Sequence, residues 1–154
     1  MRESLYIVTG ASRGLGAAMA DQLLQPGHRL LCIARRERAD LAERAAQQGV
    51  PCEQWSLDLA DPVPVAERLA AWLPTQGGSL TRACLINNAG VLSRIGPVEG
   101  AEFADLSNAL RVGLEATLLL SAAFLRATRE WSADRRILNV SSGLCRRAMA
   151  GSAS

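Results

Sequence analysis

The residues with the clearest chemical potential in this chain are glycines at the turn between its first apolar run and its first helical pattern. The turn is Thr9-Gly10-Ala11-Ser12-Arg13-Gly14-Leu15-Gly16. Glycines permit a tight turn and a close backbone approach, and the free N–H groups of a helix start favour an anion. In this strand–turn–helix context, Gly10, Gly14 and Gly16 predict a dinucleotide pyrophosphate site, the alternative being a glycine turn without a ligand.

The residues after the second predicted strand indicate which dinucleotide is preferred. An acidic residue there would bind the ribose 2′-hydroxyl of NAD, but this chain has Ala34-Arg35-Arg36. A guanidinium suits the 2′-phosphate of NADP through charge-assisted hydrogen bonds worth roughly 1.5–3 kcal/mol each. Arg13, inside the glycine turn, can bind the same phosphate. The sequence therefore predicts NADP(H), the alternative being that Arg35 and Arg36 are ordinary solvated arginines.

Most residue types needed for acid–base or metal chemistry are scarce. The chain has no lysine, one tyrosine (Tyr6) in the first predicted strand and one histidine (His28) in a predicted turn. The four cysteines are far apart, at Cys32, Cys52, Cys84 and Cys145. We therefore expect no metal site and no histidine triad, and we interpret the cysteines as small buried hydrophobes in a reducing compartment.

The composition is that of a single globular domain over residues 1–154. Apolar residues make up 49% and charged residues 21%, and 17 basic groups against 15 acidic ones leave a formal charge of +2. That charge is too small to favour a nucleic-acid partner. The longest nearly uncharged stretch, 116–125, is about half a membrane span, and the N-terminus lacks a secretory apolar region. We expect a cytoplasmic protein without a nucleic-acid or membrane partner.

Short apolar runs alternate with longer helical patterns along the chain. Strands are expected at 5–8, 29–34, 52–59, 83–86 and 136–140. The first helix is expected to begin at Gly14 and to stop at Pro26-Gly27, and the second to follow the second strand and end at about Gln48, before Gly49. The third is expected to begin at Pro62 with Asp61 as its cap, and the fourth to span about 101–131. Such alternation predicts an α/β fold: a doubly wound Rossmann-type parallel sheet of about five strands with helices on both faces.

Four motifs occur in an order and at a spacing that resemble the short-chain dehydrogenase/reductase family. They are the glycine turn, Asp58-Leu59 after the third strand, Asn87-Asn88-Ala89-Gly90 after the fourth, and Asn139-Val140-Ser141-Ser142 at the fifth. The second predicted strand is most similar to the NADPH-using sepiapterin-reductase and benzil-reductase branch. The resemblance implies that hydride passes from NADPH to a small-molecule carbonyl substrate.

The resemblance also implies roles for individual residues. Asp58 would receive the adenine amino group, with the Leu59 amide beside it. Asn88-Ala89-Gly90 would pack along the adenine ribose and stabilise the central strand. Ser142 would polarise the substrate carbonyl; without the resemblance it is an ordinary hydroxyl at a strand end.

The chain departs from the family pattern in its acid–base groups. The family uses Tyr-x-x-x-Lys a little over a dozen residues beyond the catalytic serine, which falls just past Ser154. Loss of a positioned acid–base group lowers rates by about a hundredfold to ten-thousandfold. Gly113 also stands where the family usually has an asparagine. We expect a C-terminally truncated, cofactor-binding part that is inactive alone; the alternatives are a non-catalytic dinucleotide-binding module and a truncated product without a function.

The longest predicted helix carries an apolar stripe without an expected covering partner. The stripe is Leu110, Leu114, Leu118 and Leu125, and the whole apolar face also includes Phe103, Leu106 and Ala122. In the family, the helix with the tyrosine and lysine packs beside this one and helps to form a dimer interface. Without that helix, the stripe and the edge of the fifth strand are expected to be exposed, which favours association. The resemblance thus implies a homo-oligomer, a dimer or tetramer, formed through the long helix.

Overall fold

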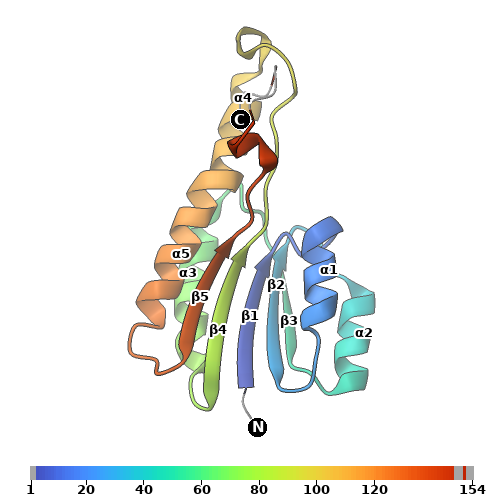
Figure 1. The fold of residues 1–154 in the computed structure, drawn as a ribbon, viewed down its shortest axis with the longest axis vertical. Coiled ribbons are helices and arrows are strands. Elements are labelled where there is room, and N and C mark those ends of the chain that lie inside the picture. Colours follow the sequence, from blue (N-terminus) through green and yellow to red (C-terminus); the bar gives the residue numbers. More distant parts are fainter. Residues whose placement is uncertain (1–2, 148–150, 152–154) are drawn as a thin grey trace.

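A single parallel sheet organises the protein, whose computed structural model describes residues 3–147 and 151 (Figure 1). Its strands are β1 (Glu3–Thr9), β2 (His28–Ala34), β3 (Cys52–Ser56), β4 (Leu80–Asn87) and β5 (Asp134–Asn139). The sheet order is β3-β2-β1-β4-β5, and every neighbouring pair is parallel. The chain winds from β1 to one edge and then crosses to β4 on the other side. This doubly wound order confirms the predicted fold and opens a crevice where β1 and β4 diverge.

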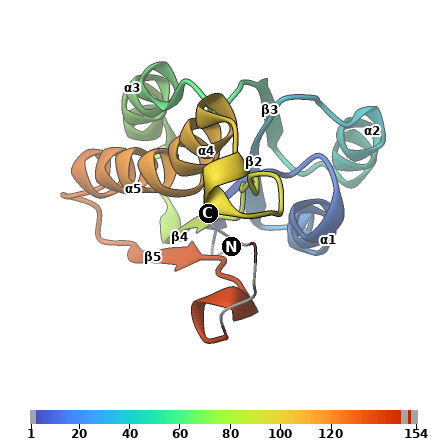
Figure 2. The ribbon, with the colours of Figure 1, turned by 90° about the horizontal axis from the view of Figure 1, so that it is seen from above.

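Helices cover both faces of the sheet, as Figure 2 shows from above. One face carries α1 (Gly14–Leu23) and α2 (Ala39–Gln48), and the other carries α3 (Pro62–Trp72) and the long helix. The long helix comprises α4 (Phe103–Leu110), a π-helical turn (Arg111–Glu115) and α5 (Ala116–Ala127). Short 3₁₀ turns occur at Leu73–Gln76, Val98–Gly100 and Gly143–Cys145.

Burial on both faces explains why the central strand is a continuous apolar run. Leu5, Ile7 and Val8 of β1 are all fully buried. Leu5 and Ile7 join the core under α3 and α5, whereas Val8 joins the core under α1 and α2. Each such side chain contributes roughly 1.5–3 kcal/mol by leaving water, so the strand that ends at the glycine turn is firmly held.

The third strand is shorter than predicted. β3 ends at Ser56 rather than at residue 59 because its neighbour β2 ends at Ala34, the residue paired with Ser56. Asp58 then turns the chain, since its side chain accepts the N–H two residues on at 3.0 Å and its carbonyl accepts that of Asp61 at 3.2 Å. Asp61 lies at the N-cap of α3, but its carboxylate makes no capping hydrogen bond, so that predicted contact is wrong.

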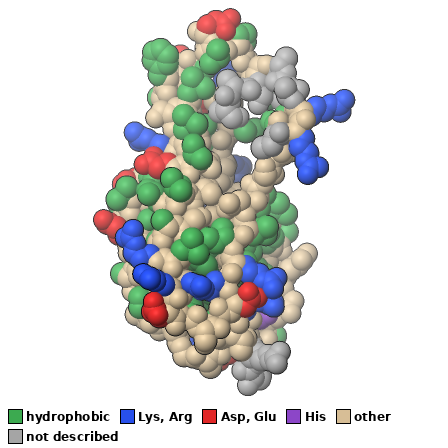
Figure 3. Space-filling model, turned by 60° about the vertical axis from the view of Figure 1, so that its left-hand side comes forward, with side chains coloured by type: hydrophobic (Ala, Val, Ile, Leu, Met, Phe, Trp, Pro, Cys, Tyr) green, Lys and Arg blue, Asp and Glu red, His purple; other side chains and the backbone are tan. Residues whose placement is uncertain are grey.

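The long helix is apolar on two sides, and the sequence pattern showed only one of them. The predicted stripe faces solvent: Leu110, Leu114, Leu118 and Leu125 are between 49% and 65% exposed, and Phe103 beside it is 89% exposed. The core is instead filled from the other side of the helix, by Ala109, Val112, Ala116, Leu120, Ala123 and Phe124. Figure 3 brings the left-hand side of Figure 1, where the long helix lies, to the front. It shows hydrophobic side chains on that surface, with arginines and carboxylates below them. The expected exposure of the stripe is confirmed.

Length and composition alone would allow the helix Phe103–Ala127 to cross a membrane. In the fold, Val112, Leu120 and Phe124 from this helix enter the same core cluster as residues of α3 and the sheet. That packing is what a core helix requires.

Candidate functional site

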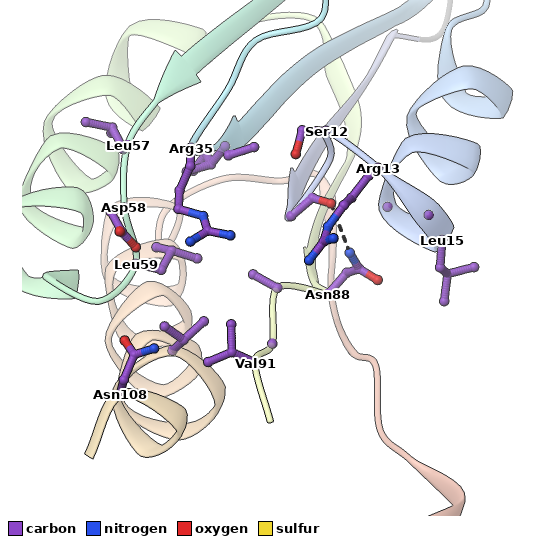
Figure 4. A pocket seen from close by; sticks show the side chains of 18 residues that line it. Ser12, Arg13, Leu15, Arg35, Leu57, Asp58, Leu59, Asn88, Val91 and Asn108 are labelled. Carbon is purple, nitrogen blue, oxygen red and sulfur yellow. Dashed lines mark hydrogen bonds between the residues drawn. The ribbon is translucent and has the colours of Figure 1, made fainter. Parts of the chain in front are cut away.

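A cavity of about 460 Å³ opens where the carboxyl ends of β1, β2 and β4 meet (Figure 4). Its lining residues are Gly10, Ser12, Arg13, Gly14, Leu15, Gly16, Ile33, Ala34, Arg35, Leu57, Asp58, Leu59, Asn88, Ala89, Gly90, Val91, Asn108 and Val112. The fold therefore brings together the glycine turn, the arginine after β2, the turn after β3 and the segment after β4, as the sequence motifs predicted.

The three glycines of the turn are required for two different reasons. Gly10 and Gly14 have φ angles of +68° and +57°, a region that disfavours side chains. A Cβ on Gly16 would lie only 2.2 Å from the Gly10 carbonyl oxygen and 2.4 Å from Nδ2 of Asn88. Gly16 therefore allows the start of α1 to approach the ends of β1 and β4. The first turn of α1 has no acidic residue and no side-chain cap, so its N–H groups suit an anion.

Thr9 links the end of β1 to the segment that follows β4. Its side chain is buried and is absent from the cavity lining, and its hydroxyl accepts the N–H groups of Asn88 and Ala89, each at 3.0 Å. The Asn88 side chain returns a hydrogen bond to the Thr9 carbonyl at 3.0 Å. These contacts fasten the segment after β4 to the glycine turn, so Thr9 positions the residues that line the cavity.

Arg35 and Arg13 both point into the cavity from opposite sides in Figure 4. Within residues 3–147 and 151, neither guanidinium has an ion pair or a side-chain hydrogen bond. Arg36 does not line the cavity. Both residues are exposed. Two cations that face one space favour an anion there, and a phosphate accepts their donors in bidentate geometry.

Arg38, four residues from Ala34, behaves differently and has a structural role. It pairs with Asp40 at 2.5 Å and with Asp21 at 3.0 Å, which ties α2 to α1. The hydrogen bond with Asp40, followed by that with Asp21, raises the pKa of Arg38. Burial alone would raise the pKa of Asp21, but hydrogen bonds from Arg38 and Arg44 bring it below its ordinary value.

Asp58 and Leu59 occupy the cavity wall after β3. Oδ1 of Asp58 accepts the N–H of Ala60, and among the described residues its other oxygen has no partner. Leu59 is 6% exposed and contributes an apolar surface. A carboxylate beside an apolar surface suits the amino group of a flat base.

Besides Thr9, Ser142 is the predicted site residue that does not line the cavity. It is exposed, caps the 3₁₀ turn Gly143–Cys145 and accepts the N–H of Leu144 through its hydroxyl at 3.2 Å. It follows β5 at the same end of the sheet as the cavity.

Six of the lining residues were not among the predicted site residues. They are Ile33, Ala34, Leu57, Val91, Asn108 and Val112. Asn108 and Val112 come from the long helix, which is far from the other motifs in sequence. Their spacing of four residues was the available sign that they share a helix face, but only the fold directs that face to the cavity.

The remaining chemically capable side chains have ordinary structural partners. Nδ1 of His28 is 2.8 Å from the Leu23 carbonyl, and its ring lies 4.8 Å from that of Tyr6. In the part of the chain that is described, Cys32, Cys52 and Cys84 are free thiols, and no group of three potential metal ligands occurs. Cys145 is outside the set of side chains described.

A glycine turn braced against the crevice of a doubly wound sheet, with unpaired arginines beside it, defines a Rossmann-type dinucleotide-binding fold. The family model described as short chain dehydrogenase matches residues 4–154. The chain belongs to the short-chain dehydrogenase family, which confirms the resemblance of its motifs.

Similar proteins agree with this assignment and with its predicted branch. A benzil reductase ((S)-benzoin forming) of Bacillus cereus is 35% identical over 89% of this chain and 55% of its own length. A sepiapterin reductase of Xenopus laevis is 30% identical over 90% of this chain and 56% of its own length. The chain thus spans about half the length of these relatives. The crystal structure of a metagenomic short-chain oxidoreductase in complex with NADP has a TM-score of 0.80 and 30% identity, covering 99% of this chain and 67% of the other.

Proposed function

We propose that residues 1–154 form the NADP(H)-binding domain of a short-chain oxidoreductase that reduces a small-molecule carbonyl. The observation that carries the proposal is the pair of unpaired guanidiniums, Arg35 and Arg13, beside the open N-terminus of α1. A 2′-phosphate and a pyrophosphate together satisfy both features. The similar metagenomic structure with NADP supports the same choice.

The residues present fit such a cofactor. The backbone at Gly10, Gly14 and Gly16 would hold the pyrophosphate. Side chains at Gly10 and Gly16 would collide with neighbouring atoms of the turn and of Asn88-Ala89, so glycine is needed for this backbone geometry. Asp58 would accept from the adenine amino group. When bound, the cofactor supplies hydride; this chain supplies its binding and orientation.

Ser142 would donate a hydrogen bond to the substrate carbonyl oxygen. The chain contains no lysine, and Tyr6 lies in β1, away from the carboxyl ends of the strands. We infer that the acid that protonates the alkoxide comes from outside these 154 residues, and that the chain alone does not turn over. The names of the similar benzil and sepiapterin reductases support an organic carbonyl as the substrate.

We also infer a cytoplasmic homo-oligomer. Free thiols at Cys32, Cys52 and Cys84 support a reducing compartment. The exposed stripe on the long helix, with Leu114 and Leu118 at its centre, supports contact with a second copy.

The direct test is titration of the purified chain with NADPH and NADH, followed by nicotinamide fluorescence. We expect saturable NADPH binding, with NADH at least tenfold weaker. Equal affinity for the two would contradict the role of Arg35 and Arg13. No binding of either would overturn the domain's proposed function, and NADPH-dependent reduction of benzil by the chain alone would overturn its proposed inactivity.

A further inference from the structure

Cys32 and Cys52 place two thiols together on adjacent strands, and the proposed function gives neither of them a role. Cys52 pairs with Leu30 of β2, so Cys32 is its diagonal neighbour on the same face of the sheet. Both side chains pack in the core under α1 and α2, and the two thiols are hydrogen-bonded to each other. Two neighbouring thiols are the groups that form a disulfide on oxidation.

The two thiols have different environments. Cys52 is half-buried, whereas Cys32 is only 3% exposed. The hydrogen bond from Cys32 lowers the pKa of the Cys52 thiol, while the same hydrogen bond, together with burial, raises the pKa of Cys32. A peroxide reacts first with the more accessible thiol of lower pKa, and a protected thiol beside it completes the disulfide. Cys52 is therefore the thiol that reacts first.

A bond between the two sulfurs requires β3 to move. Strands about 4.8 Å apart, with a rise of about 3.3 Å per residue, put diagonal Cα atoms roughly 8 Å apart. A disulfide usually spans no more than about 6.8 Å between Cα atoms, so β3 must slide by about 2 Å towards its carboxyl end. β3 is a five-residue strand whose only neighbour in the described sheet is β2, so it is free to shift on its other side. The strain also makes the disulfide easy to reduce.

β3 is tied directly to the segment that carries Arg35. The Ser56 hydroxyl donates to the Arg35 carbonyl at 3.0 Å. The Gln54 side chain accepts the N–H of Arg38 and donates to the Arg38 carbonyl, each at 2.8 Å. Asp58, which lines the cavity, lies two residues after the end of β3. Movement of β3 therefore displaces both the segment with the Arg35 guanidinium and the cavity wall at Asp58.

We propose that Cys32 and Cys52 form a redox switch, in which oxidation to a disulfide by hydrogen peroxide lowers the affinity of the cavity for NADPH. The peroxide O–O bond breaks as the Cys52 sulfur gains an oxygen, which gives a sulfenic acid and one water. The Cys32 sulfur then bonds to the Cys52 sulfur, and the sulfenic hydroxyl leaves with the Cys32 proton as a second water. Two electrons pass from the sulfurs to the peroxide. The inference rests on the proposed function and adds regulation of the same site; disulfides in reducing compartments are typically transient and redox-sensing.

The test treats the purified chain with hydrogen peroxide and measures the disulfide and NADPH binding separately. Peptide mass mapping should find a Cys32–Cys52 bond. Fluorescence titration should show NADPH binding weakened by about tenfold, as expected for the loss of one charge-assisted hydrogen bond. Dithiothreitol should break the bond and restore the affinity.

Two variants separate this pair from other oxidation. Cys52→Ser removes the thiol that reacts first, so its NADPH affinity should be the same before and after peroxide. Cys84→Ser is the matched control, because Cys84 is a buried free thiol on β4 that lies outside the pair. It should form the Cys32–Cys52 bond and lose affinity as the unaltered chain does.

The two measurements have distinct failures. If no Cys32–Cys52 bond forms, or if Cys52→Ser loses affinity in peroxide as the unaltered chain does, the switch is overturned while NADPH binding stands. If the bond forms and the affinity is unchanged, β3 does not control the cavity and the inference is likewise overturned. If the reduced chain does not bind NADPH, the proposed function is overturned, and the regulation of the site with it.

Discussion

Replacing glycine with alanine should stabilise the fold at one position of this chain and destabilise it at two others. Gly16 and Gly113 both lie in helices, where alanine is ordinarily more stable than glycine by about 1 kcal/mol. At Gly113 the new Cβ would meet nothing within 4 Å. Gly113→Ala should therefore stabilise the fold by about 0.5–1 kcal/mol.

At Gly16 the steric term reverses this preference. The Cβ would lie 2.2 Å from the Gly10 oxygen, 2.4 Å from the Asn88 amide and 2.8 Å from the Gly10 carbonyl carbon. Ordinary contacts begin near 3.4 Å, so α1 must move by about 1 Å relative to the ends of β1 and β4. Overpacking of this kind costs about 1–3 kcal/mol. The movement also separates the N–H groups that would hold the pyrophosphate.

Gly14 isolates the backbone effect, because its φ is +57° and a Cβ there would meet nothing within 4 Å. Gly14→Ala should cost about 1–2 kcal/mol through the left-handed conformation alone. Urea unfolding should therefore rank Gly113→Ala first, then the unaltered chain, Gly14→Ala and Gly16→Ala. NADPH titration should show the largest loss for Gly16→Ala, by at least tenfold. If Gly16→Ala proved as stable as Gly113→Ala, the close packing at the turn would be refuted.

Three further outcomes test other parts of the structure. Arg35→Asp should weaken NADPH binding by about tenfold to a hundredfold, because one charge-assisted hydrogen bond of roughly 1.5–3 kcal/mol is lost. NADH binding should change little. Equal losses for the two ligands in fluorescence titration would refute the contact of Arg35 with the 2′-phosphate. Arg38→Ala should lower stability at neutral pH. Because Asp21 and Asp40 have folded pKa values below their ordinary ones, their stabilisation is present above about pH 4 and is lost as the pH falls further; urea titrations should show the gap to the unaltered chain closing in acid, and a pH-independent gap would refute the pairing. Leu118→Glu should lower the oligomeric mass in analytical ultracentrifugation, whereas an unchanged mass would place the interface elsewhere.

Local sequence determined the elements and the parts of the site that lie next to them. Apolar runs gave the strands, Gly49 with its φ of +63° ended α2 as expected, and the turn 9–16 followed β1 directly. Such features depend on backbone conformation and side-chain type within a few residues. The family motifs then predicted which strand ends share one crevice, because parallel strands present their carboxyl ends at the same edge.

Tertiary structure alone decided which groups are paired and which are free. Arg35 and Arg38 are close neighbours of the same type, yet Arg38 is tied to Asp21 and Asp40 while Arg35 faces the cavity. Similarly, both sides of the long helix are apolar, and only packing on α3 and the sheet buries Phe124 and leaves Leu118 exposed. Asn108 enters the site for the same reason: partners distant in sequence are chosen by the three-dimensional arrangement of the helices, which spacing along one helix does not contain.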